Sequence, residues 1–304
     1  MTTVAGPSVV RPGIGTGPVG TGRGNSERGQ WDAGPVLLLP DASRGAWLVG
    51  RAGGWATVGG VAGTGFEAYA RLLHPVRAHR ADPTRTDPCG GAREVEHTRW
   101  PWAEVARRND RVVHPLVQWR RLTDDEQTMD WPDGWRVDQT DEGWFDPADL
   151  AALTTHLRGA TRTPEDVLVA AWEGTGNPPW ADRGRHARAR ARMQLHWPGR
   201  DMWLFSSSVT ELEDPSWAQR RVAGWECSRP GQAGPSTSLI WPADHAWVVA
   251  SEEDWDSTIV AGSRALVDGV LADGRFEAFE VRETDDLSWE GDVLNPPRRT
   301  TPRP

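Results

Sequence analysis

The sequence predicts an α+β protein with a mixed or mainly antiparallel sheet and helices packed on one face. Capped amphipathic stretches typical of helices occur among short apolar runs typical of strands, with turns rich in glycine, proline and aspartate between them. With 304 residues, 38% of them hydrophobic, the chain is long enough to bury a sizeable core. We expect a folded body over 31–294 and disordered tails over 1–30 and 295–304, because glycine or proline dominates both ends.

Capping signals predict three helices. The first runs from Pro101 to Arg108 and begins with proline, which suits the first helical position. The second follows the N-cap pair Asp146 and Pro147, and it places an apolar face on one side, made of Leu150, Leu153 and Leu157. The third covers 263–271 and ends at an Asp-Gly stop. A capping-type start at 163–166 precedes an apolar run that suits a buried strand, and both interpretations of this stretch stay open.

Strict alternation over 186–197 predicts a half-buried strand, joined by a turn at 198–201 to a second strand over 202–206. One side of the first strand presents three arginines, Arg188, Arg190 and Arg192. We expect these guanidinium groups to pair with acidic residues across strands, and the alternative is that they clamp an anionic ligand.

An internal similarity suggests that the body consists of two pseudo-repeated lobes, 31–160 and 161–294. The order strand, turn, strand, loop, helix is predicted twice, and each copy has two tryptophans eight residues apart. The predicted elements are strands 38–41 and 46–49 with helix 66–73, and strands 239–242 and 246–249 with helix 264–271. Chance similarity in a tryptophan-rich chain is the alternative explanation.

Composition excludes several classes of function. The net charge is −9, so nucleic acid is a poor partner for the acidic body. All basic residues are arginine, and the absence of lysine excludes Schiff-base chemistry on lysine and the lysine of a phosphate-binding loop. A GxGxxG match at 15–20 has no strand before it and no helix after it, so no dinucleotide or other cofactor is predicted. Two distant cysteines and no apolar leader or membrane span indicate a cytoplasmic protein.

Two groups of residues are candidates for function. Asp244, His245, Glu252 and Asp254 belong to the densest group of acids near a histidine. Such carboxylates could share a proton or hold a divalent cation, as in a hydrolase, although a solvated turn is the simpler interpretation. Trp131, Trp135 and Trp144 stand in polar loops, where indoles bind sugars or anchor a protein partner. No sequence motif for a metal site is present.

The stretches FEAYARLLHP at 66–75, WEG at 172–174 and WPADHAW at 241–247 resemble a family of uncharacterised proteins from high-GC Gram-positive bacteria. That family has no assigned activity, so the resemblance implies no catalytic residues. Scattered tryptophans, Leu-Pro turns and acidity are also similar to the SMI1/KNR4-type immunity and adaptor proteins.

These observations favour a non-catalytic cytoplasmic protein that binds another protein through tryptophan surfaces rimmed by acids, as an immunity-like or adaptor module. The first alternative is a hydrolase, metal-assisted or not, that uses the residues between 244 and 256. The second alternative is binding of a carbohydrate or small ligand through the tryptophans.

Overall fold

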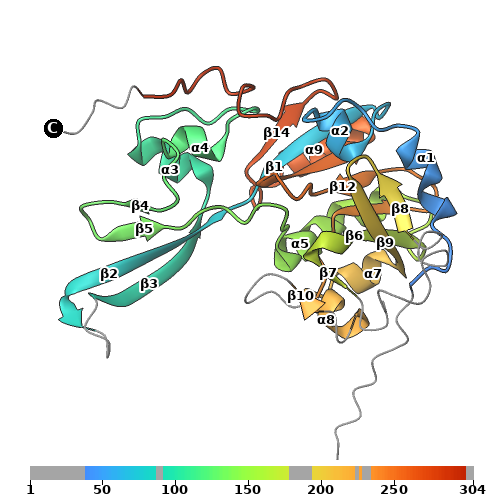
Figure 1. The fold of residues 1–304 in the computed structure, drawn as a ribbon, viewed down its shortest axis with the longest axis horizontal. Helices are drawn as coiled ribbons and strands as arrows, with labels where there is room; N and C mark the ends of the chain where they lie inside the picture. The colour runs from blue at the N-terminus through green and yellow to red at the C-terminus, as the bar shows by residue number, and fades with distance from the viewer. Residues whose placement is uncertain (1–37, 87–91, 178–193, 223–225, 228–233, 299–304) are drawn as a thin grey trace, which may run out of the picture. The chain divides into compact units, whose positions relative to one another are not determined.

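The computed structural model describes residues 38–86, 92–177, 194–222, 226–227 and 234–298. Helices and antiparallel sheets are both present, which confirms the predicted α+β class (Figure 1). Residues Ala33–Pro304 form one compact unit.

Among the described residues, the main sheet has eight strands in the order β14-β1-β13-β12-β11-β6-β9-β8, and all neighbours are antiparallel. Every residue of β1 and β13 is buried, because apolar clusters lie on both faces of the sheet. The strands are β1 (Ala68–Leu73), β6 (Val167–Trp172), β8 (Gln194–Trp197), β9 (Arg200–Ser207), β11 (Leu239–Pro242), β12 (Val248–Ala250), β13 (Ser257–Gly262) and β14 (Ala278–Val281).

Helices cover both faces of this sheet. On one face, α5 (Pro147–Leu157) and α9 (Arg264–Leu271) bury their apolar stripes, together with α7 (Val209–Leu212) and α8 (Trp217–Arg221). On the other face lie the short helices α1 (Ala46–Val49) and α2 (Val58–Ala62). The prediction that helices pack on one face is therefore wrong, because the strands are apolar on both sides and need two covers.

A second sheet has four strands in the described part of the chain, in the order β3-β2-β5-β4. The helices α3 (Trp102–Arg108) and α4 (Trp119–Leu122) pack on it around a separate apolar cluster. The strands are β2 (Val76–Thr86), β3 (Ala92–Trp100), β4 (Met129–Asp130) and β5 (Trp135–Val137). Two-residue strands β7 (Gly176–Asn177) and β10 (Glu226–Cys227) pair with each other, and single 3-10 turns are η1 (Ser43–Gly45), η2 (Arg158–Ala160) and η3 (Glu173–Thr175).

The three predicted helices are confirmed as α3, α5 and α9. The Asp146 carboxylate accepts a hydrogen bond from the Ala148 amide at 2.8 Å, as the N-cap prediction requires. The hairpin of β8 and β9 is also confirmed, whereas Arg188, Arg190 and Arg192 lie outside the described residues. The ambiguous stretch at 163–169 becomes a strand from Val167 onward.

The predicted repeat is wrong. Residues 46–49 form a helix, whereas 248–250 form a strand, and residues 68–73 form a strand, whereas 264–271 form a helix. Strand β1 lies between β13 and β14, so a strand of the first supposed lobe (31–160) is enclosed by strands of the second (161–294). The two lobes therefore do not exist as separate bodies.

The prediction of a C-terminal tail over 295–304 is wrong for its first four residues. The Asn295 side chain is buried, and its Oδ1 accepts a hydrogen bond from the Val112 amide at 2.9 Å. The Arg298 guanidinium donates to the carbonyl of Asn109. Residues 295–298 are thus tied to the body, and the rest of that tail and the N-terminal tail over 1–30 lie outside the described residues.

Candidate functional site

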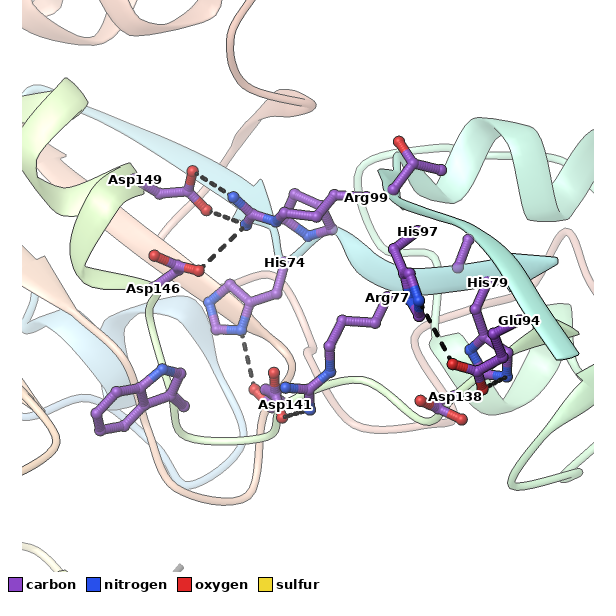
Figure 2. Close-up of a pocket in the computed structure, with 14 residues that line it drawn as sticks. His74, Arg77, His79, Glu94, His97, Arg99, Asp138, Asp141, Asp146 and Asp149 are labelled. Atoms are coloured by element: carbon purple, nitrogen blue, oxygen red, sulfur yellow. Dashed lines mark hydrogen bonds and ion pairs between the residues drawn. The ribbon is translucent and has the colours of Figure 1, made fainter. Parts of the chain in front are cut away.

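A cleft of about 590 Å³ is bounded on one side by the β2–β3 hairpin and on the other by residues 138–149 (Figure 2). The hairpin contributes Arg77, His79, Glu94, His97 and Arg99. The facing segment contributes Asp138, Asp141, Trp144, Asp146 and Asp149. His74, the residue after β1, also lines the cleft.

The register of the hairpin places four of its basic residues on one face. Arg77 lies opposite Arg99, and His79 lies opposite His97. Residues two apart in a strand point to the same side, so these four side chains share a face. The His79 and His97 rings are 6.4 Å apart between centroids.

A β-bulge adds a carboxylate to this face. Glu94 precedes His97 by three residues, and in a regular strand the two would point to opposite sides. The register shifts here, since Val95 is an extra residue between the pairs Arg80–Glu96 and Ala81–Glu94. The Glu94 carboxylate therefore lies 3.4 Å from His97 Nε2 and 3.9 Å from His79 Nε2.

The opposite side of the cleft is acidic; we call residues 138–149 the acidic wall. The segment carries five carboxylates and no basic residue, and its acids are Asp138, Asp141, Glu142, Asp146 and Asp149. Arg99 forms a two-point ion pair with Asp149, and Arg77 Nη2 lies 2.9 Å from Asp141 Oδ1. The two hairpin arginines that line the cleft are thus already neutralised by the acidic wall.

Negative charge remains after these pairs are counted. Among the residues that line the cleft, carboxylates outnumber guanidinium groups five to two. The half-buried Asp138 carboxylate makes no hydrogen bond or ion pair with any residue in the described part of the chain. Unpaired negative charge attracts opposite charge, so a cationic group that enters the cleft would be stabilised here.

The buried histidine behind the cleft is neutral. His74 Nδ1 lies 3.2 Å from the Asp141 carbonyl oxygen, and Nε2 lies 2.8 Å from Thr258 Oγ1. Burial lowers the pKa of His74 to about 4. The ring therefore holds the acidic wall through neutral hydrogen bonds.

A buried ion pair ties the acidic wall to the main sheet. Arg71 is 1% exposed, and its Nη2 lies 3.8 Å from Asp256 Oδ1, while Thr140 Oγ1 donates to Asp256 Oδ2 at 3.3 Å. Burial lowers the pKa of Arg71 to about 10 and raises the pKa of Asp256 to about 6. The guanidinium also donates to Ser257 Oγ and to the carbonyl groups of Pro115 and Val117.

The acids and histidine predicted near 244–256 do not form one site. Asp244 and His245 lie in the connection before β12, and Glu252 and Asp254 lie in the connection after it, at opposite ends of that strand. The Asp244 carboxylate accepts hydrogen bonds from the Thr161 hydroxyl at 2.7 Å and the Arg162 amide at 2.8 Å, so it holds a turn.

The other members of that group also have structural partners. The His245 ring stacks on Trp47 with centroids 3.9 Å apart. Glu252 and Asp254 share Arg200, at 2.9 Å and 2.7 Å. Within the described residues, no group of three or more histidine, cysteine, aspartate or glutamate side chains could hold a metal ion.

The predicted tryptophans divide into two kinds. Trp131 and Trp135 pack against Trp100, with ring centroids 5.8 Å and 4.7 Å from it, and they cover the core of the second sheet. Trp144 alone among the three lines the cleft, where it is partly exposed. Of the three tryptophans, Trp144 is the one that lies among the carboxylates lining the cleft.

Sequence reasoning missed the hairpin side of the cleft. A usable signal was present, since Arg-x-His at 77–79 is mirrored by His-x-Arg at 97–99. An antiparallel hairpin between the two triplets brings like residues opposite each other.

Comparison with known proteins adds no relative: no family model, no curated protein and no solved structure matches the chain. None of the helices in the described residues has the length and apolar character needed to cross a lipid bilayer.

Proposed function

We propose that the protein is a non-catalytic, cytoplasmic adaptor or immunity-like protein that binds a basic segment of another protein in the cleft. The observation on which the proposal rests is the charge of the cleft: carboxylates outnumber guanidinium groups five to two, and the Asp138 carboxylate has no partner among the described residues. Complementary charge directs association and selects against wrong partners. Trp144 adds an indole on which a guanidinium or alkyl stem can pack.

The arrangement of nucleophiles and bases supports a binding function. Among the described residues, a hydrogen-bonded series that resembles a nucleophile and its base runs from His74 through Thr258 to Ser251, with contacts of 2.8 Å and 2.7 Å. Thr258 is 0% exposed and Ser251 is 1% exposed, so a substrate has no access to these hydroxyls. The hydrolase alternative at 244–256 loses support as well, because its residues lie at both ends of β12.

One observation favours the carbohydrate alternative. Trp55 is 84% exposed and lies beside Trp255, with ring centroids 6.3 Å apart. Exposed indoles of this kind bind sugars by stacking. A screen of sugars monitored by tryptophan fluorescence, repeated with Trp55→Ser, tests this alternative directly.

The main proposal is tested with a fluorescein-labelled nonapeptide of alternating arginine and threonine, measured by fluorescence anisotropy. A matched peptide with glutamate in place of arginine should not bind. Asp138→Asn should weaken binding of the basic peptide about fivefold or more, which corresponds to about 1 kcal/mol. Glu290→Gln, which removes the same charge from an exposed residue outside the cleft, is the control. Equal binding of both peptides, or unchanged binding by Asp138→Asn, would overturn the proposal.

A further inference from the structure

We infer that the basic segment binds as an additional β-strand along the outer edge of β3. This inference rests on the proposed function, because it specifies how the partner occupies the cleft. Edge-strand addition combines main-chain hydrogen bonds, which give affinity, with alternate side chains, which give specificity.

Strand β3 presents an open and long edge. Within the part of the chain that the structure describes, it is the terminal strand of its sheet and pairs only with β2. It has nine residues, against two in β4 and four each in β8 and β14, the other terminal strands of the two larger sheets as far as the structure describes them. Residues 93–99 are exposed. A partner strand therefore has more edge to pair with on β3 than on any of these.

The hydrogen bonds of β2 show which main-chain groups of β3 are free. The Arg77 carbonyl accepts a hydrogen bond from the Asp138 amide at 3.2 Å, so the backbone N–H and C=O groups of Arg77 point toward β5. The backbone N–H and C=O groups of successive residues point to opposite sides of a strand. Those of Ala78 therefore point toward β3, where Ala78 lies opposite Thr98. The neighbours of Thr98, His97 and Arg99, thus point their N–H and C=O groups to the open edge.

The chemistry around this edge favours a basic partner over a second copy of the chain. Edge-to-edge pairing of two copies would bring two acidic walls together, each with five carboxylates and no basic residue. The edge also has the bulge at Val95 and several charged side chains, which are features that discourage self-association of exposed strands. A basic partner strand would be attracted instead of repelled, because its positive charges face the carboxylates of the acidic wall.

The geometry also specifies the partner's sequence pattern. Side chains of an added strand alternate between the two faces of the sheet. Every second side chain would point to the face that bears Glu94 and His97, which is the face that lines the cleft (Figure 2). We therefore expect arginine or lysine at every second position of the bound segment.

N-methylation of the basic nonapeptide, one amide at a time, tests the inference. An N-methyl group removes one N–H donor and leaves charge and side chains unchanged. Methylation at alternate positions should weaken binding about tenfold, whereas methylation at the intervening positions should change it less than about twofold. Uniform effects along the peptide would overturn strand addition and leave charge-dependent binding in place. No binding by the unmodified peptide would overturn the proposed function, and the inference with it.

The state of the free protein provides a second test. Sedimentation of the intact chain should show a monomer, with and without the peptide. A dimer that the peptide dissociates would assign the β3 edge to a second copy and overturn the inference.

Discussion

Replacement of Asp256 by asparagine should change how the stability of the protein depends on pH. Two buried groups near the cleft have pKa values that are shifted in opposite directions. Burial raises the pKa of Asp256 to about 6, from 3.8 for a free aspartate. Burial lowers the pKa of His74 to about 4, from 6.5 for a free histidine. Between about pH 4 and pH 6 the folded protein holds more protons on Asp256, and fewer on His74, than the unfolded chain does.

These shifts fix the sign and size of the effect. The contribution of Asp256 to the free energy of unfolding is complete below pH 3.8 and is lost as the pH rises through about 6. The contribution of His74 is complete above pH 6.5 and is lost as the pH falls through about 4. Each amounts to about 3 kcal/mol, so the two offset each other in the wild-type protein. In Asp256→Asn the destabilisation from His74 is no longer offset, so the free energy of unfolding should fall by about 3 kcal/mol on acidification.

Urea unfolding at several pH values between about 4 and 6.5 measures this difference. All other titrating groups are common to both proteins and cancel when the variant is subtracted from the wild type. Asp138→Asn, the same substitution in the cleft, is the control. Parallel pH profiles for Asp256→Asn and the wild type would refute the reasoning. His74→Asn should show the reverse, with stability that increases on acidification relative to the wild type.

Three further substitutions test the fold around the cleft. Leu153→Ala removes a side chain that is 0% exposed on α5 and should lower the free energy of unfolding by about 2–5 kcal/mol, measured by urea unfolding. Gly143→Ala should destabilise by about 1–3 kcal/mol and weaken peptide binding, because φ is +66° and a Cβ would lie 2.5 Å from Glu253 Cα. Full stability and binding in this variant would contradict the tight packing of the acidic wall. Trp55→Ser, at an 84% exposed position, should change stability by less than about 0.5 kcal/mol.

Local signals predicted the elements whose structure is decided locally. Helix α5 begins where the N-cap Asp146 and Pro147 place it, and its buried leucines are the ones that the helical period selects. The hairpin of β8 and β9 follows from a Pro-Gly turn between apolar runs.

Long-range packing decided the elements that were predicted wrongly. Residues 66–73 suit an amphipathic helix if Arg71 is placed on a polar face. In the structure Arg71 is buried, because Asp256 and backbone carbonyl groups surround its guanidinium. Those partners come from residues 115–117 and 256–257, so the sequence around Arg71 does not predict them.

The candidate site was predicted in part for the same reason. Trp144 and its acidic neighbours are consecutive in the sequence, so their composition alone indicated a binding surface. The hairpin histidines and arginines of the cleft come from two strands about twenty residues apart, and Glu94 reaches their face only through the bulge. A register shift of one residue is a tertiary property, and the alternation of the sequence does not reveal it.

The position of β1 has a consequence for how the chain folds during synthesis. Both neighbours of this strand, β13 at Ser257–Gly262 and β14 at Ala278–Val281, follow it by more than 180 residues. At about 5–20 residues per second, a ribosome needs roughly 10–40 s to produce them after β1 has been made. Until then β1, which is apolar apart from Arg71, has neither of the strands with which it pairs. Nascent chains of this protein are therefore expected to need a chaperone until translation has passed β14.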